Sequence, residues 1–396
     1  MPAAAAVPFL IVVLSIYLLI HIYLLRRLRQ AFKHKPRFLR DSAEFAIIFA
    51  ALLYPVSRSA AALLPADLGG AMLKWGAIYL GWLFYMLMGL LLRDLWQVGQ
   101  NRIIKHTKTP LLQANSFLFL CTIAALITGA GILRASQPQT VIQELSFDKK
   151  LPIDKPLHLL FAADLHLDES VPPERLQKWV KRMNQQQADA IFLVGDILDG
   201  HQPHRLYDRF GETLHQLQSR YGVYVVPGNH EYYVGIDSAL SFFRSCGMIV
   251  LRDSTLIVEN AFAVVGRDDQ THNAFYGKRK SLADLLQNID RSLPIIVLDH
   301  QPVGLQEAAD QAVDLQVSGH THNGQLFPLN WITRLSFKNS YGLSQKGETY
   351  CYVTCGLGTW GPPMRTTSRP EIVLIRIDSL PQIKIEKHKG SYREHF

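Results

Sequence analysis

Five groups of polar side chains, each directly after a short apolar run, carry the chemistry of this 396-residue sequence. They are Asp164-Leu165-His166, Gly195-Asp196-Ile197-Leu198-Asp199, Gly228-Asn229-His230-Glu231, Asp299-His300 and Gly319-His320-Thr321-His322. Imidazole together with carboxylate suits borderline divalent ions such as Zn, Mn or Fe. A shared aspartate can bridge two such ions about 3.5–4 Å apart, which is the spacing of two-metal hydrolytic sites. The residue types therefore predict a pair of divalent metal ions and a hydrolytic reaction.

The apolar runs before these groups are predicted to be buried strands, at residues 157–163, 190–194, 223–226, 295–298 and 314–317. Amphipathic stretches predict helices between them, at residues 172–186, 205–220, 237–246 and 281–290. This alternation favours an α/β domain. Since open α/β sheets bind ligands outside the carboxyl ends of their strands, the five groups should meet at one place. Further strands at 348–354, 371–377 and 382–388 follow without helices, which predicts a mixed sheet with an antiparallel end or a second packed sheet.

Glycine precedes the polar residues in three of the groups, at Gly195, Gly228 and Gly319. Glycine adopts backbone conformations that other residues avoid. Each of the three is therefore predicted to turn the chain sharply off its strand, so that the next side chain faces the metal ions.

In this order the groups DxH, GDxxD, GNH[ED], H and GHxH resemble the calcineurin-like metallophosphoesterase superfamily, over about residues 156–388. The ending Gly356-Leu357-Gly358-Thr359 with Arg369-Pro370-Glu371 is similar to the membrane-anchored bacterial branch. The resemblance implies a layered α/β/β/α metallophosphoesterase sandwich. It also implies metal ligands: Asp164, His166 and His322 for the first ion, Asn229, His300 and His320 for the second, and Asp196 as the bridge. His230 would contact the phosphoryl group or protonate the leaving oxygen.

Several residues near these groups have two interpretations each. Asp199 and Asp299 either orient imidazoles and turns or are solvated turn carboxylates. Glu231 fits the start of a helix. Arg365 lies in a Gly- and Pro-rich segment and either grips a phosphate or lies on the surface. His201 follows the second group and could line the mouth of the site.

The N-terminal third contains four long apolar segments, at about residues 7–25, 45–64, 75–92 and 111–133. Each is close to the ~20 residues that cross a bilayer. Residues 1–134 are therefore predicted to form a transmembrane region with four helices. The second segment contains Pro55 and Arg58, which a membrane interior disfavours, and Arg58 is expected at an interface or facing the bundle. A polar connector, 135–155, leads to the metallophosphoesterase domain, 156–396.

The charge distribution favours a membrane over a nucleic acid as the partner of this chain. Residues 1–134 hold 14 Lys and Arg against 4 Asp and Glu, whereas residues 135–396 hold 27 against 29. The basic residues gather at 26–40 and 93–108, between apolar segments. Lys and Arg beside membrane spans favour the cytoplasmic side. Four crossings then predict a multi-pass protein of the cell (inner) membrane with an extracytoplasmic catalytic domain.

Together these features predict a membrane-bound dinuclear-metal phosphoesterase that uses Mn, Fe or Zn and cleaves a phosphodiester or pyrophosphate. Its location makes an envelope lipid or lipid precursor a candidate substrate. A phosphomonoesterase or protein phosphatase is the alternative among enzymes. A membrane transporter or sensor with a ligand-binding soluble domain is the alternative from another class. The complete metal-ligand set and the scarcity of charge within the spans argue against the transporter or sensor.

Overall fold

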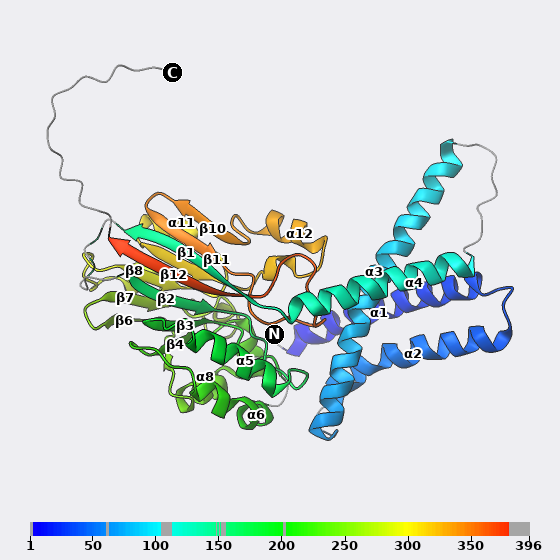
Figure 1. Cartoon of the computed structure of the whole chain (residues 1–396), viewed down its shortest axis with the longest axis horizontal. Coiled ribbons are helices and arrows are strands. Elements are labelled where there is room, and N and C mark those ends of the chain that lie inside the picture. The colour runs from blue at the N-terminus through cyan, green and yellow to red at the C-terminus, as the bar shows by residue number, and fades with distance from the viewer. Residues whose placement is uncertain are drawn as a thin grey trace, which may run out of the picture.

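The chain forms a helical N-terminal region and a separate α/β domain, which Figure 1 shows side by side. The computed structural model describes residues 3–60, 63–103, 113–147, 149, 151, 156–200 and 203–379. The strand predicted at 382–388, the residue His201 and parts of the predicted connector and of the basic loop 93–108 lie outside the described residues.

Four helices form in the N-terminal region, as predicted. They are α1 (Ala3–Ala31), α2 (Arg37–Ser59), α3 (Ala66–Ile103) and α4 (Ala114–Ala135). Three stretches, Leu10–Ala31, Asp67–Gln100 and Ala114–Ala135, are long and apolar enough to cross a membrane. By length and composition, three spans are thus supported rather than the predicted four. Helix α2 falls outside this set because charged residues occupy its first two turns and it contains Pro55 and Arg58.

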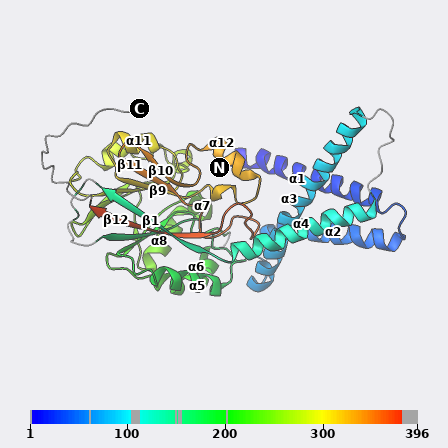
Figure 2. The same cartoon turned by 45° about the horizontal axis from the view of Figure 1, so that its top comes forward.

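The helices α1, α2 and α4 extend away from the α/β domain, and α3 crosses them (Figures 1 and 2). The loop between α1 and α2 lies at the end that is remote from the domain (Figure 1). Charged residues near that end are paired: Arg29 of α1 donates to Glu44 of α2 at 2.8 Å, and Arg27 of α1 pairs with Asp94 of α3. Ion pairs therefore hold together the part of the helical region that is richest in basic residues.

The α/β domain contains two six-stranded mixed sheets, which agrees with the predicted second sheet. The first has the order β1 (Gln139–Phe147), β12 (Glu371–Ser379), β2 (Leu157–Ala162), β3 (Ala190–Val194), β4 (Val223–Val226) and β5 (Ile249–Val250). The second has the order β10 (Gly342–Lys346), β11 (Thr349–Val353), β9 (Leu315–Ser318), β8 (Ile295–Leu298), β7 (Phe262–Gly266) and β6 (Ser254–Val258). Strand β1 lies within the predicted connector and pairs in parallel with β12.

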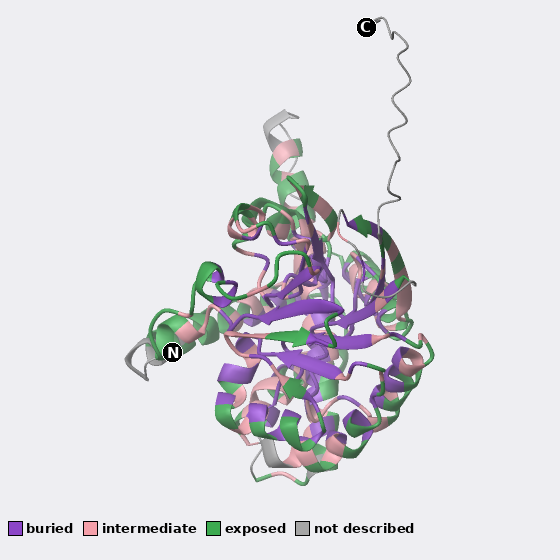
Figure 3. Ribbon diagram, turned by 90° about the vertical axis from the view of Figure 1, so that its left-hand side faces the viewer, coloured by how far each residue is buried: buried purple, intermediate pink, exposed green. Residues whose placement is uncertain are grey.

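Aromatic side chains from the two sheets share one apolar core. Phe161 and Phe192 of the first sheet belong to the same buried cluster as Phe262 and Tyr352 of the second. The rings of Phe192 and Phe262 lie 6.3 Å apart, nearly perpendicular to each other. Figure 3 shows these buried strands at the centre of the domain, with less buried helices around them.

Helices pack against both sheets. The helices α5 (Pro173–Asn184), α6 (Pro203–His215) and α8 (Ile236–Ser245) contribute to a buried cluster with first-sheet residues. The helices α10 (Leu282–Leu285) and α11 (Leu305–Asp310) do the same with β7 and β8 of the second sheet. Three short helices, α7 (Asn229–Val234), α9 (His272–Phe275) and α12 (Leu329–Ser336), and the 3-10 turn His322–Gly324 complete the described elements.

Loops of the α/β domain pack directly on the membrane helices. The Tyr85 hydroxyl of α3 donates to the carbonyl of Phe327 at 3.1 Å and lies 2.6 Å from the Thr366 hydroxyl. The amide of Arg365 donates to the carbonyl of Gly131 in α4 at 3.0 Å. Met364 is completely buried in the cluster formed by the helices. The helices are therefore in contact with the loops that follow the strands.

Candidate metal centre

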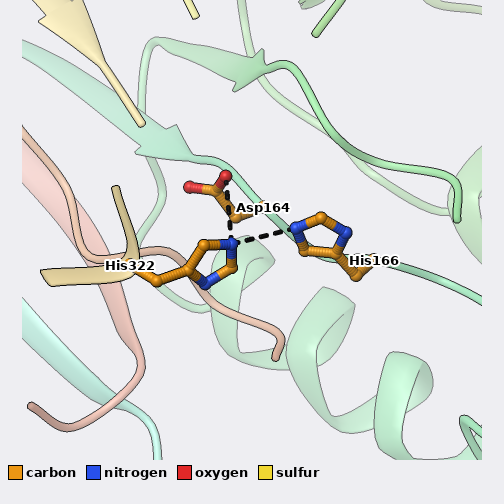
Figure 4. Close-up of side chains that lie close together, drawn as sticks. All are labelled: Asp164, His166 and His322. Atoms are coloured by element: carbon orange, nitrogen blue, oxygen red, sulfur yellow. Dashed lines mark hydrogen bonds and ion pairs between the residues drawn. The ribbon is translucent and has the colours of Figure 1, made fainter. Parts of the chain in front are cut away.

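The strand ends bring the predicted ligands together. Asp164 and His166 follow β2, Asp196 follows β3, Asn229 begins α7 after β4, His300 follows β8, and His320 and His322 follow β9. Figure 4 shows the three predicted ligands of the first ion, in which His322 points between Asp164 and His166. The Nε2 atom of His322 lies 3.6 Å from Asp164 Oδ1 and 3.0 Å from His166 Nε2.

Two sets of three side chains could each hold a metal ion, since their ligand atoms lie within 4.8 Å of one another. One set is Asp164, His166 and His322, and the other is Asp196, His300 and His320. Asp196 belongs to the second set and also lies close to the first, because its Oδ2 is 3.1 Å from His300 Nε2 and 3.8 Å from His166 Nε2. A third set, His166, Asp199 and His230, adjoins the first.

The donor atoms fit metal ions because two of them lack a hydrogen-bond partner. Asn229 Oδ1 and His300 Nε2 are both buried without one. Buried polar atoms are ordinarily hydrogen-bonded, so such atoms at one site call for a ligand. The other ring nitrogen of His300 is 2.8 Å from the carbonyl of Val194 and donates to it. That hydrogen bond aims Nε2 towards Asp196, as second hydrogen bonds commonly orient metal-binding histidines.

The electrostatics of the site also favour cations between its side chains. Burial lowers the pKa of His300, but the charges of Asp196 and Asp164 outweigh burial and hold it well above its usual value. Burial lowers the pKa of His320 to about 4, and burial together with His166 and Arg365 holds the pKa of His322 far below normal. His320 and His322 are therefore neutral at pH 7, which is the form of imidazole that binds metals.

Five of the predicted ligands have left-handed backbone conformations. The φ angles are 54° at Asp164, 46° at His166, 53° at Asp196, 71° at His320 and 49° at His322. Residues other than glycine rarely adopt such angles, and sparsely populated conformations cost about 1–3 kcal/mol each. Hydrogen bonds between the two loops, from the amide of Asp164 to Gly195 and from that of His166 to the carbonyl of Asp196, both 3.0 Å, fix these conformations. The fold thus strains its backbone to aim the ligands at one another.

The three predicted turn glycines serve two different purposes. Gly195 has a φ of +76°, as expected for a sharp left-handed turn. Gly228 has a φ of −107°, which other residues adopt readily, but a Cβ there would collide with Asp196 Oδ1. A Cβ at Gly319 would lie 2.5 Å from Asp164 Oδ2. The prediction of a conformational role is therefore wrong for Gly228 and Gly319, where close approach to a predicted ligand carboxylate excludes a side chain.

His230 forms a hydrogen-bonded ion pair beside the first set of ligands. Its Nδ1 lies 2.9 Å from Asp199 Oδ1, and the second oxygen of Asp199 lies 3.3 Å from His166 Nδ1. Burial lowers the pKa of His230, but the hydrogen bond to Asp199 and the charge of Asp196 raise it to about 9. His230 is thus a cation at neutral pH. The position of Asp199 favours the interpretation that it orients imidazole rings over that of a solvated turn carboxylate.

Glu231 is completely buried and accepts four backbone hydrogen bonds, so it does more than begin a helix. Its Oε2 accepts from the amides of Asp196 at 2.9 Å and Gly228 at 2.7 Å. Its Oε1 accepts from the amides of Ile197 at 2.8 Å and Leu198 at 3.0 Å. One carboxylate therefore ties the loop after β3 to the loop after β4.

Asp299 and Arg365 are also buried structural residues. Two nitrogens of the Arg279 guanidinium donate to the two oxygens of Asp299 at 2.9 and 2.8 Å. Arg365 is completely buried and donates to the carbonyls of Gly358 at 2.6 Å and Gly356 at 3.3 Å, 3.3 Å from His322 Nδ1. The surface interpretation of Arg365 is therefore wrong: this residue is buried and holds a loop against the predicted ligand His322. No pattern in the sequence indicated this role.

One site residue that sequence reasoning missed comes from the helical region. Arg58, near the end of α2, places its Nη2 atom 3.9 Å from Asp199 Oδ1. The sequence signal for it was a lone cation at the end of an apolar segment. The helical region therefore contributes a charge next to the Asp199–His230 pair.

Comparison with known proteins identifies the family. Residues 157–324 match the calcineurin-like phosphoesterase family. The chain is 33% identical over 232 residues to a metallophosphoesterase of Aquifex aeolicus, covering 58% of this chain and 88% of that protein. It is 32% identical over 298 residues to a transmembrane protein with metallophosphoesterase domain of Danio rerio, covering 69% and 67%. A metallophosphoesterase of Helicobacter pylori J99 is 32% identical over 231 residues, and the match spans 60% of its length.

The chain therefore belongs to the calcineurin-like metallophosphoesterases, a family of metal-dependent phosphoester hydrolases, as the order of its motifs predicted. The bacterial relatives agree with the predicted bacterial branch. The apolar helices and the transmembrane relatives indicate that it is a membrane protein.

Proposed function

We propose that this chain is a membrane-bound hydrolase with two divalent metal ions (Mn, Fe or Zn) that cleaves a phosphodiester or a pyrophosphate. The position of Asp196 in one ligand set and close to the other carries this proposal, because one carboxylate near both sets suits a bridge. The first ion would be held by Asp164, His166 and His322. The second would be held by Asn229, His300 and His320.

Bound divalent ions would supply an activated water as nucleophile and neutralise charge on the phosphoryl oxygens. His230 supplies the proton that the departing oxygen needs. Its Nδ1 pairs with Asp199, which leaves Nε2 as the donor towards substrate. Because the pKa of His230 is raised to about 9, the proton is present at pH 7. Asp199 orients the ring and keeps it charged.

The catalytic domain is proposed to lie on the extracytoplasmic side of the inner membrane. Support comes from the loop between α1 and α2, which belongs to the first basic group and lies at the helix ends remote from the domain (Figure 1). Helix α2 returns from that loop to the domain, where Arg58 meets Asp199. Its uncharged stretch between Glu44 and Arg58 extends about 20 Å. Both flanking charges are paired, Glu44 with Arg29 and Arg58 with Asp199, so we include α2 as a fourth crossing.

We also assign a helix–sheet–sheet–helix order to the domain. The aromatic core common to both sheets and the separate clusters formed by α5, α6 and α8 and by α10 and α11 support this order.

A substrate panel on the purified full chain in detergent with Mn tests the activity. We expect hydrolysis of bis(4-nitrophenyl) phosphate, with slower release from 4-nitrophenyl phosphate, and loss of both in Asp196→Asn. Full metal content without hydrolysis of any phosphoester in the panel would refute the proposal and favour a ligand-binding sensor. A reporter fused after Phe396 that works only outside the cytoplasm tests the orientation, and an inactive reporter would refute it.

A further inference from the structure

A cavity of about 350 Å³ opens beside two of the proposed metal ligands. Its lining includes His320, His322, Leu326, Leu329, Ile332 and Trp360. Apart from the histidines, these side chains offer mostly apolar surface. A phosphate needs charged or hydrogen-bonding partners, whereas an apolar wall suits hydrocarbon. The cavity therefore fits a part of the substrate that differs chemically from the phosphate.

The short helix α12 forms one wall of this cavity and also exposes a large apolar surface. Leu329 and Ile332 of α12 line the cavity. On the same helix 57% of Trp331, 59% of Ile332 and 89% of Leu335 are exposed. Apolar patches of this kind mark interaction sites, and Trp and Leu on a surface helix are typical of a membrane interface.

The cavity is continuous with the helical region. Leu326 and Met364 are buried in the same apolar cluster as Met86 of α3 and Phe117 of α4, and Leu329 packs against that cluster. In both Figure 1 and Figure 2, α12 lies at the end of the domain that adjoins the helices. The cavity thus lies between the metal centre and helices whose surface is apolar and exposed.

We propose that this cavity binds the hydrocarbon chain of a lipid phosphoester whose phosphate lies at the metal centre, and that α12 lies in the membrane interface. The proposal rests on the proposed phosphoesterase function and adds the chemical class of its substrate. A lipid would enter past α12 with its chain between Ile332 and Trp360. Its head group would then reach His320 without leaving the membrane surface.

Binding of two phosphonates to the full-length chain tests the cavity without turnover. Methylphosphonate and dodecylphosphonate share a head group and differ only in the chain. Each buried methylene contributes about fourfold in affinity, so the chain should raise affinity by at least about tenfold, measured by titration calorimetry in one fixed detergent. Ile332→Asp places a charge in the cavity. It should reduce the ratio of dodecylphosphonate to methylphosphonate affinity by about tenfold. Ile332 is half exposed, so the variant should fold.

The matched control is Ile257→Asp. Ile257 is 41% exposed on β6, at the edge of the second sheet, and does not line the cavity. Micelles take up dodecylphosphonate equally in all samples. A difference in affinity between variants therefore comes from the protein and not from the detergent. The control should keep the wild-type preference. Equal affinity for both phosphonates, or the same preference in Ile332→Asp as in the control, overturns the proposal.

Turnover distinguishes this failure from failure of the proposed function. The substrates are 4-nitrophenyl phosphodiesters with methyl or dodecyl as the second ester, and kcat/KM should be higher for dodecyl. If neither is hydrolysed but the phosphonate preference depends on Ile332, the hydrolase proposal fails and the cavity proposal stands. If both are hydrolysed with equal kcat/KM and the two phosphonates bind with equal affinity, only the cavity proposal fails. The exposed apolar surface of α12 would then be assigned to a contact with another protein.

Discussion

Glu231→Gln should uncouple the two loops that carry Asp196 and Asn229 while changing the shape of the side chain very little. The carboxylate accepts four backbone amides, two on each oxygen. Glutamine replaces one oxygen with an NH₂ group, which can only donate. Whichever way the amide turns, two backbone N–H groups then face a donor in a completely buried place.

The size of the effect follows from these contacts. A hydrogen bond to a charged group contributes about 1.5–3 kcal/mol, so two lost bonds lower the free energy of unfolding by about 3–6 kcal/mol. For a domain of this size, 1 kcal/mol corresponds to about 2–4 °C in Tm, which predicts a fall of at least about 6 °C. Metal content and activity should fall too, because the same amides position Asp196.

Thermal unfolding, metal analysis and amide hydrogen exchange of the full chain test this prediction. The amides of Asp196 and Ile197 should lose protection. Glu307→Gln is the matched control, since Glu307 also accepts a backbone amide, that of Leu282 at 2.9 Å, but is partly exposed and belongs to none of the ligand sets. It should lower the free energy of unfolding by less than Glu231→Gln does, because Glu307 accepts fewer backbone amides and is partly exposed, and it should leave activity unchanged. An unchanged Tm and full metal content in Glu231→Gln would refute the reasoning.

Four further outcomes are expected. Asp196→Asn should abolish hydrolysis and lower metal content while circular dichroism remains that of the wild type; normal turnover would contradict a shared bridge. His230→Ala should keep both ions but lower kcat by ~10²–10⁴, less for substrates with good leaving groups, and loss of an ion would instead make it a ligand. Arg58→Ala should raise KM for anionic substrates with Arg58→Lys intermediate, whereas equal KM in all three proteins would leave Arg58 a packing residue. Burial raises the pKa of Glu307, but the hydrogen bond from Arg267 outweighs burial, and the pKa is lowered overall. The pair therefore stabilises the fold above the unfolded pKa of about 4.5, and this stabilisation is lost as the pH falls. In acid denaturation, Glu307→Gln should flatten that part of the curve of unfolding free energy against pH.

The strands that carry the site could be predicted because their sequences are short, apolar and followed by polar groups. The predictions for β3 and β4 match the structure at both ends, and that for β8 does as well. Strand β10 could not be found in this way, because its sequence Gly-Leu-Ser-Gln-Lys is half exposed and shows no apolar run. Strand β1 was assigned to the connector because its place depends on pairing with β12, more than 200 residues further along the chain.

Residue type predicted which side chains meet at the metal centre, but not what holds them there. Ligands are chosen for their donor atoms, so Asp and His in an ordered set of motifs are visible in a sequence. Glu231, Arg279 and Arg365 act on backbone groups or on a buried partner, and such contacts leave no pattern of residue types. Charged residues are rarely buried unless they have partners. The sequence did not reveal these partners, so the burial of the three charges could not be predicted.

The strain in the ligand backbone gives these hidden residues a common purpose. Five of the proposed ligands have left-handed φ angles, although none is glycine, and such angles persist only when the surroundings hold them in place. Glu231 fixes the loop of Asp196, and Arg365 fixes the loop beside His322. Arg58 from α2 and the hydrogen bond from the amide of Arg365 to the carbonyl of Gly131 in α4 extend the same support into the helical region. The membrane helices are thus part of the structure that positions the metal centre, and detaching the α/β domain from them should weaken the site as well as release it from the bilayer.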